Sequence, residues 1–199
     1  ENFAALPYER IPSFIYTLYH LEGTSRQMMM FAILTASRMK AVRLATWGEI
    51  DFEKRLWDIP PEHDKIKDPK RDRTIYLSRQ AFEVLKKIRP NRPRTDELIF
   101  KTKNGGSFSD SATTALIRRM HERQKALDGT GWIDPGKSKR EGKTCIVTAH
   151  GTARSGFRTW AKDDHLGNNR EYDQGAAELC LLHCKASDEY HGEPTTEHG

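Results

Sequence analysis

Cysteine is scarce in this sequence, and long hydrophobic runs are missing. Three cysteines occur among 199 residues, an odd number without regular spacing, which argues against a disulfide framework and fits a reducing compartment. No apolar run approaches the roughly 18 residues that a membrane helix needs, and residues 1–10 lack the basic and apolar segments of a signal peptide. We therefore expect a folded protein that does not enter a membrane.

Acidic motifs that hold a catalytic metal are missing as well. The sequence contains no DxD or HExxH pattern for magnesium or zinc. Cys180, His183 and Cys184 lie close together and could belong to a zinc site, but no second ligand pair follows at the spacing of a zinc finger. We expect no metal and no cofactor.

Positive charge, in contrast, is abundant and clustered. The net charge is +5, and residues 65–94 alone contain eleven lysines and arginines against three acids. Residues 137–158 contain six basic residues against one acid. Clusters of this kind are typical of a protein that binds a polyanion, usually nucleic acid. A solvated basic surface without a partner is the alternative.

Hydrophobic spacing predicts a single α+β domain that is mostly helical, with a small antiparallel sheet and no interdomain linker. Met28 to Leu34 is apolar all round, as in a buried helix. Further helices are expected from Pro12 to Gly23, through Val42 to Trp47, from Ser78 to Pro90, from Ser109 or Asp110 through Met120, and over residues 176–183.

Short alternating segments predict the sheet. Residues 48–60 read as a β-hairpin, residues 73–78 as a further strand, and Leu98 to Phe100 as another short strand. Residues 128–144 are rich in glycine, proline and lysine, which predicts a flexible basic loop.

Polar residues that interrupt apolar segments form a candidate active site. They are two arginines, one lysine, two histidines and one tyrosine, a set that suits phosphodiester chemistry without a metal: Arg38, Arg154, Lys65, His150, His183 and Tyr190. Arg38 interrupts an apolar run, where a charge is costly unless it is paired or binds an anion.

The segments around these residues resemble the catalytic domain of phage- and prophage-type tyrosine recombinases, over nearly the whole chain. "LTASRMKAVRLATWGEID" resembles the motif of the first arginine, Arg38, and "WDIPPEHDKIK" resembles the hairpin of the catalytic lysine, with Lys65 favoured over Lys67. "TAHGTARSGFRTWA" resembles the histidine–arginine box with His150 and Arg154, and "AAELCLLH" resembles the helix that ends in the second histidine, His183.

The resemblance implies integration and site-specific recombination of DNA through a 3′-phosphotyrosyl intermediate. Tyr190 would be the nucleophile, Arg38 and Arg154 would hold the phosphate oxygens, and Lys65 would protonate the leaving 5′-oxygen. His150 would accept the tyrosine proton or hold the phosphate, and His183 would donate a hydrogen bond to it. DNA-backbone contacts are expected from Lys67, Lys70, Arg71, Arg73, Lys139, Arg140 and Arg158.

The partner implied by the resemblance is double-stranded DNA that carries attachment sites, in the cytoplasm of a bacterial host. The full-length protein would act as a tetramer on DNA. Residues 1–199 would be its catalytic domain, monomeric alone, without the N-terminal DNA-binding domains and with a truncated or degenerate C-terminal segment.

Three features depart from the family pattern. Ala41 stands where an acidic residue usually supports the first arginine, so that support is expected to be missing. His150 and Arg154 are four residues apart rather than three. Tyr190 follows His183 by seven residues, whereas nine to eleven are usual. Either Tyr190 is the nucleophile in a shortened connection or this chain lacks the true one, so we expect weak or absent cleavage.

Three other readings stay open. A type IB topoisomerase would use the same chemistry to relax supercoils, although the small size and the phage-like hairpin argue against it. A cleavage-deficient DNA-binding remnant would explain Ala41 and the unusual C-terminal segment. A basic helical protein without a role on DNA is the third alternative.

Overall fold

Helix α2 (Thr24–Leu34) is the centre of the fold and is flanked by two hydrophobic clusters. Met28 belongs to the cluster that includes Trp57 of the sheet. Met29, the next residue, belongs to the cluster that includes Trp132. The prediction of a buried helix that is apolar all round is confirmed, because different faces of α2 meet different layers.

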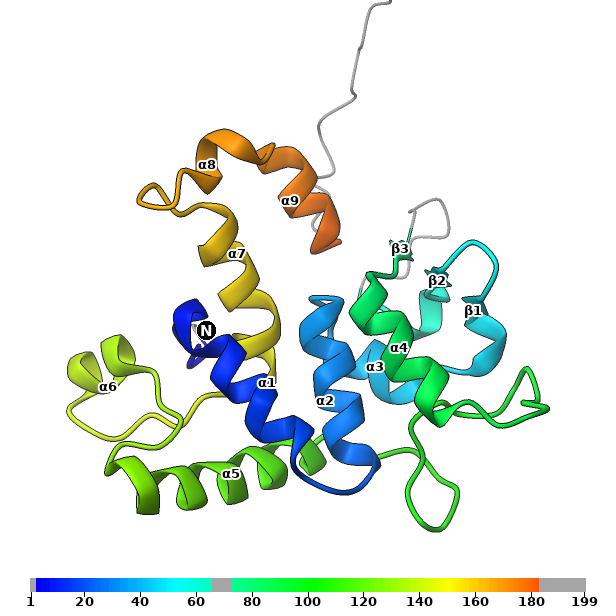
Figure 1. Cartoon of the computed structure of the whole chain (residues 1–199), viewed down its shortest axis with the longest axis horizontal. Helices are drawn as coiled ribbons and strands as arrows, with labels where there is room; N and C mark the ends of the chain where they lie inside the picture. The colour runs from blue at the N-terminus through cyan, green and yellow to red at the C-terminus, as the bar shows by residue number, and fades with distance from the viewer. Residues whose placement is uncertain (1–2, 66–72, 183–199) are drawn as a thin grey trace, which may run out of the picture.

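The computed structural model describes residues 3–65 and 73–182, and Figure 1 shows the arrangement of its elements. The α-helices are α1 (Ile11–Tyr19), α2, α3 (Met39–Leu44), α4 (Arg79–Ile88), α5 (Ala112–Asp128), α6 (Pro135–Glu141), α7 (Gly156–Ala161), α8 (Asn168–Glu171) and α9 (Gln174–Cys180). Shorter turns are the 3-10 helices η1 (Tyr8–Arg10), η2 (Trp47–Glu49) and η3 (Pro61–His63), and the π-helical turn η4 (Gly151–Ser155).

The antiparallel sheet has the order β1-β2-β3 and lies at one end of the molecule beside α4 (Figure 1). In β2, Trp57 pairs with Ile50 on one side and Ile75 on the other. Its fully buried ring lies 5.1 Å from the ring of Phe31 on α2, which attaches the sheet to the core. The predicted hairpin and third strand are confirmed, as is the mostly helical α+β class. The strands are β1 (Ile50–Asp51), β2 (Leu56–Asp58) and β3 (Thr74–Tyr76).

The strand predicted for residues 98–100 is wrong. Leu98 makes a single bridge to Thr46, and the Ile99 N–H donates to the carbonyl of Ala45 at 2.9 Å. Ile99 and Phe100 are buried in the core cluster. These apolar residues therefore fill the core, where burial rather than strand pairing explains their pattern.

Two further helices differ from the predictions, one in its first residue and one in its existence. Ser111, rather than Ser109 or Asp110, precedes α5, and its side chain makes no capping hydrogen bond. The segment expected to be a flexible loop contains α6, because Asp134 caps it by accepting the Lys137 N–H at 2.7 Å and a proline follows at the first helical position. An aspartate and then a proline are a typical helix start, which the glycines around them obscured.

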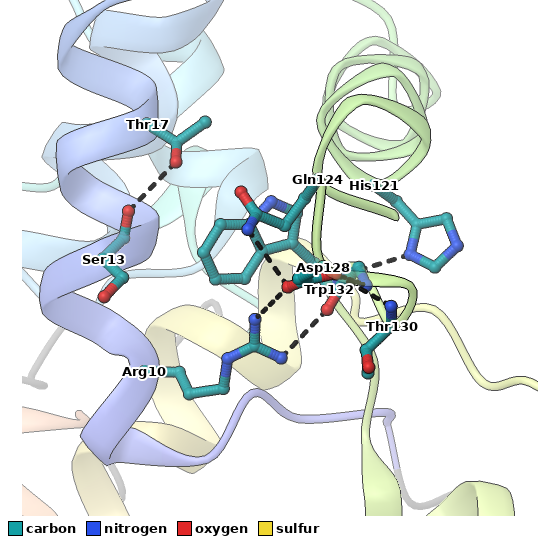
Figure 2. Close-up of polar contacts among 9 residues, drawn as sticks. Arg10, Ser13, Thr17, His121, Gln124, Asp128, Thr130 and Trp132 are labelled. Carbon is teal, nitrogen blue, oxygen red and sulfur yellow. Dashed lines mark hydrogen bonds and ion pairs between the residues drawn. The ribbon is translucent and has the colours of Figure 1, made fainter. Parts of the chain in front are cut away.

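An ion pair and a cation–π contact fasten α1 to the end of α5 (Figure 2). The guanidinium of Arg10 lies 4.7 Å from the centre of the Trp132 ring and donates to the carbonyl of Gly131 at 2.9 Å. Its other nitrogen pairs with Asp128 at 3.4 Å. The carboxylate of Asp128 also accepts the N–H groups of Gly131 and Thr130 at 2.7 and 2.8 Å. These contacts close the turn that follows α5.

Acid should loosen this turn. The backbone N–H groups of Gly131 and Thr130 lower the pKa of Asp128 to about 2, below its ordinary value. The charged form of Asp128 therefore stabilises the folded state above the unfolded pKa of about 3.9, and this contribution is lost as the pH falls toward 2. We expect the free energy of unfolding, measured with urea between pH 5 and pH 2, to fall less steeply in Asp128→Asn than in the original protein. Equal slopes would contradict the assignment.

Candidate active site

Arg38 lies in the turn between α2 and α3, immediately before Met39. Two residues earlier, Ala36 has φ of 47°, in the left-handed region that non-glycine residues seldom occupy, and this tight turn ends α2. Arg38 Nη1 lies 3.0 Å from Asp64 Oδ1, and its side chain keeps 18% exposure. The expectation of a missing acidic support, drawn from Ala41, is wrong, because Asp64 supplies a carboxylate from a different segment.

Asp64 is a buried carboxylate between two arginines. Its side chain is 2% exposed, and Oδ2 lies 3.3 Å from Nε of Arg73. Arg73 is itself only 4% exposed. The contact of Arg73 with the DNA backbone stays a prediction, although its guanidinium faces Asp64 inside the protein.

Lys65 follows Asp64 and is exposed, on the connection between β2 and β3. Its backbone N–H donates to Asp64 Oδ1 at 2.6 Å, so the same oxygen contacts both Arg38 and Lys65. Two predicted site residues from separate segments are thus joined by one carboxylate. Lys67, Lys70 and Arg71 lie outside the described residues.

The turn η3, which leads into Asp64, rests on the buried carboxylate of Glu49. One Glu49 oxygen accepts the Thr46 N–H at 3.0 Å and lies 3.1 Å from Nδ1 of His63. The other accepts the indole N–H of Trp57 at 2.9 Å. Burial raises the pKa of Glu49, and the hydrogen bonds from Trp57 and Thr46 oppose that rise. Glu49 thereby attaches the segment before Asp64 to the sheet.

Arg154 is buried and joins two segments that are remote in sequence. Its Nη1 donates to the carbonyl of Ala36 at 2.8 Å, 118 residues away, in the turn that carries Arg38. Its Nη2 donates to the carbonyl of Leu181, just before the position of His183. The structure thus brings Arg154 to the turn of Arg38 and to the end of α9. His183 and Tyr190 themselves lie outside the described residues.

The helix that carries Arg154 begins with a π-helical turn. The N–H of Gly156 donates to the carbonyl of Gly151, five residues back, whereas an α-helix uses four. A π-turn holds one residue more than an α-turn and often occurs at functional sites. His150 directly precedes this turn and Arg154 lies within it, so the turn takes up the extra residue that makes their spacing four.

A close backbone crossing explains why glycine follows His150. The N-terminal segment runs across the start of this helix, and the Thr148 N–H donates to the carbonyl of Ala4 at 2.9 Å. A Cβ atom on Gly151 would lie 2.1 Å from that carbonyl oxygen. His150 is half-buried, and its ring centre lies 4.4 Å from that of Phe3.

The remaining predicted DNA contacts fall on two helices. Lys139 and Arg140 are exposed on α6, at the left of Figure 1. Arg158 on α7 has a side chain that is 52% exposed, and its Nε lies 2.8 Å from Glu178 of α9. Glu178 also lies 3.4 Å from Lys162, so this acid ties α9 to α7.

A cavity of about 400 Å³ adjoins the turn before Arg38. Thr35 and Ala36 line one side, Thr74 and Tyr76 of β3 another, and Phe157 and Leu182 close it. Among residues 3–65 and 73–182, no group of three or more histidine, cysteine, aspartate or glutamate side chains could hold a metal ion. No helix in the same ranges is long and apolar enough to cross a membrane.

Asp64 is the residue that the sequence reasoning missed. It stands in a run of alternating charges, "EHDKIKDPKRD", which is typical of a solvated loop. Its position directly before Lys65 was the available signal. Burial of this one carboxylate could not be read from the sequence, because it depends on Arg38 and Arg73 meeting it from two other segments.

Gly151 and Gly156 provide a matched test of the backbone crossing. Gly151→Ala should lower the free energy of unfolding by about 1–3 kcal/mol, because its Cβ would collide with backbone atoms of Ala4 and Ala5. Gly156→Ala, on the same helix, would meet its nearest atoms at 3.6 Å, an ordinary contact, and alanine favours a helix. Chemical denaturation of both variants measures the difference. Equal stabilities would contradict the close approach.

The chain matches the phage integrase family over residues 6–159. Among curated proteins, the integrase of Enterobacteria phage P4 is 32% identical over 133 residues, which cover 60% of this chain and 30% of that protein. Prophage integrase IntA of Escherichia coli (strain K12) is 28% identical over 92 residues, which cover 45% of this chain and 22% of that protein. The chain thus spans less than a third of these relatives.

The fold is also similar to that of solved structures. The Tn1549 transposon integrase, in complex with circular intermediate DNA, superposes with a TM-score of 0.66 at 13% identity over 92% of this chain and 58% of the other. Residues 75–356 of lambda integrase, as a dimer bound to a core site, give 0.57 at 13% identity over 98% of this chain and 63% of the other. At these identities the likeness concerns the fold.

Proposed function

The chain belongs to the phage integrase family, and on that premise we propose that it supplies the catalytic part of an enzyme for site-specific recombination and integration of DNA. One observation carries the proposal: Arg154 holds the turn of Arg38, 118 residues away, while Asp64 joins Arg38 to Lys65. These contacts link the three segments that carry Arg38, Lys65 and Arg154, which supports a shared phosphodiester site. The DNA-bound structures of similar fold support the same substrate.

In the proposed reaction, the hydroxyl oxygen of Tyr190 attacks the phosphorus of one strand. A tyrosine O–P bond forms and the bond from phosphorus to the 5′-oxygen breaks, so the backbone energy is kept in the protein–DNA link. Arg38 contacts a non-bridging oxygen, whose negative charge grows in the transition state. Arg154, whose terminal nitrogens donate to the carbonyls of Ala36 and Leu181 in the structure, would contact the other non-bridging oxygen by exchanging one of these hydrogen bonds for the phosphate. Lys65 gives its proton to the leaving 5′-oxygen. His150 accepts the tyrosine proton, and His183 donates a hydrogen bond to the phosphate.

The DNA partner is held by lysines and arginines of the two basic stretches of the sequence. Such contacts bind the phosphate backbone and fix the register of the protein without reading the sequence. We propose that the full-length protein acts as a tetramer on paired attachment sites in the bacterial cytoplasm, and that residues 1–199 alone are monomeric. The proposed contacts are Lys67, Lys70, Arg71, Arg73, Lys139, Arg140 and Arg158, of which Arg73 is buried against Asp64 in the structure.

Two alternatives are less well supported. A type IB topoisomerase would relax supercoiled plasmid without attachment sites, but the family match is to phage integrases. A cleavage-deficient remnant was suggested by Ala41, and that argument loses force because Asp64 pairs with Arg38.

Covalent trapping tests the reaction. On nicked duplexes with a randomised central sequence, we expect a slow protein–DNA adduct that resists denaturation and disappears in Tyr190→Phe. Arg38→Ala should slow its formation by about 10²–10³, because one charged donor to the transition state is lost. Tyr172→Phe is the matched control, since Tyr172 packs on Trp160 and should not affect the rate. Adduct that persists in Tyr190→Phe would assign the nucleophile elsewhere.

Binding should depend steeply on salt. If lysines and arginines neutralise phosphates, the logarithm of the binding constant falls against the logarithm of salt concentration with a slope of about −0.9 per phosphate. Lys139→Glu with Arg140→Glu should reduce that slope, whereas Lys54→Gln, outside both basic stretches, should leave it unchanged. This slope is measured by fluorescence anisotropy with a labelled random duplex, at salt concentrations between about 50 and 200 mM. Salt-independent binding would count against a DNA partner.

A further inference from the structure

We propose that Asp64 is a positioning residue that holds Arg38 and Lys65 in a fixed relation to each other before DNA binds. The proposal deepens the function proposed above and rests on it, because it assigns Asp64 the task of preparing the phosphate site. Asp64 does not touch DNA in this scheme. It acts through the two cationic residues that do.

The geometry of one oxygen atom carries the argument. Asp64 Oδ1 lies 3.0 Å from Arg38 Nη1 and 2.6 Å from the backbone nitrogen of Lys65. Asp64 and Lys65 are neighbours on the connection between β2 and β3, and the contact with Arg38 joins this connection to the turn after α2. A shift of one segment relative to the other would break the hydrogen bond from Arg38 to a charged acceptor, which is stronger than one to a neutral acceptor.

The second oxygen shows why this carboxylate can be buried. Asp64 Oδ2 meets Nε of Arg73 at 3.3 Å, and both side chains are nearly inaccessible, at 2% and 4% exposure. A buried carboxylate is tolerated when it is paired and hydrogen-bonded. Arg73 balances the charge of Asp64 from the interior, while the side chain of Arg38 keeps 18% exposure. The two arginines therefore differ: Arg73 stabilises Asp64, and Asp64 orients Arg38 at the surface of the site.

Position 41 gives independent support. The family resemblance leads us to expect an acidic residue there, and the chain has alanine, which is buried in the apolar core. A carboxylate beside Arg38 is nevertheless present, and it comes from Asp64. Asp64 belongs to the connection that carries Lys65, so it links Arg38 to that connection. An acidic residue at position 41, on α3, would not itself make this link.

Preorganisation is the expected benefit. A guanidinium that is held in place before the substrate arrives does not have to reorder when charge develops on the phosphate. It can therefore stabilise the transition state directly. Loss of Asp64 should therefore lower the rate of cleavage at saturating protein while the affinity for DNA stays nearly the same. A merely structural role would instead make activity follow stability.

The test compares four variants: Asp64→Asn, Arg73→Gln, the double variant Asp64→Asn/Arg73→Gln, and Asp58→Asn. Either single change breaks the buried ion pair between Asp64 and Arg73 and lowers the melting temperature, whereas the double change removes both charges. Asp58 accepts a hydrogen bond from Thr74 across the sheet and serves as the matched control. Rates are measured by covalent trapping, affinities by anisotropy and stabilities by melting.

We expect the double variant to be at least as stable as Arg73→Gln, yet to cleave about 10²-fold more slowly than the original protein. The cleavage rate of Arg73→Gln, which retains Asp64, should fall by less than about tenfold, because Arg73 acts on Arg38 only indirectly. The cleavage rate of Asp58→Asn should be unchanged. The proposal is overturned if the double variant cleaves as fast as Arg73→Gln, or if the rates simply follow the melting temperatures.

A second readout separates this proposal from the proposed function. The guanidinium signals of Arg38 in nuclear magnetic resonance, assigned by their loss in Arg38→Lys, report how freely the group rotates. They should show restricted rotation in the original protein and in Arg73→Gln, and free rotation in the double variant. If the original protein forms no adduct, its proposed cleavage fails, and Arg38 rotation still decides whether Asp64 positions it. Identical Arg38 signals in all variants would overturn the positioning role.

Discussion

The buried guanidinium of Arg154 is the contact on which the arrangement of the site depends. It donates hydrogen bonds to the carbonyl of Ala36 on one side and to that of Leu181 on the other. These two residues are 145 positions apart in the sequence. Both carbonyls lie at helix ends, where backbone acceptors lack partners within the helix. One charged side chain therefore satisfies two such groups and fixes the end of α9 against the turn of Arg38.

The charges around Arg38 form a second level of organisation. Three guanidinium groups with low exposure, Arg38, Arg73 and Arg154, would repel one another in an apolar interior. Asp64 offsets two of them, and the carbonyls around Arg154 accept its donors. An entering phosphate would meet groups that are already fixed by the protein, instead of having to order them itself.

The sequence allowed the helices and the hairpin to be predicted wherever one local pattern dominated, as in the apolar run of α2 and the alternation around Trp57. Arg38, His150 and Arg154 could be selected because each belongs to a motif several residues long. Asp64 could not, since its burial results from contacts with Arg38 and Arg73 and leaves no local pattern. Helix α6 was missed for another reason: its Asp134 cap was present, but the surrounding glycines favoured a loop.

The π-turn at the start of α7 has a consequence for everything that follows it. In an ordinary α-helix each residue turns the chain by about 100°, so one added residue would rotate every later side chain onto a different face. The wider turn absorbs that rotation within Gly151–Ser155. Beyond the turn, Phe157 and Trp160 lie on one face of α7, with ring centres 6.0 Å apart, and Trp160 meets Tyr172 at 5.1 Å. A change of length is thus confined to a single turn, and the angular phase of the helix beyond it is preserved.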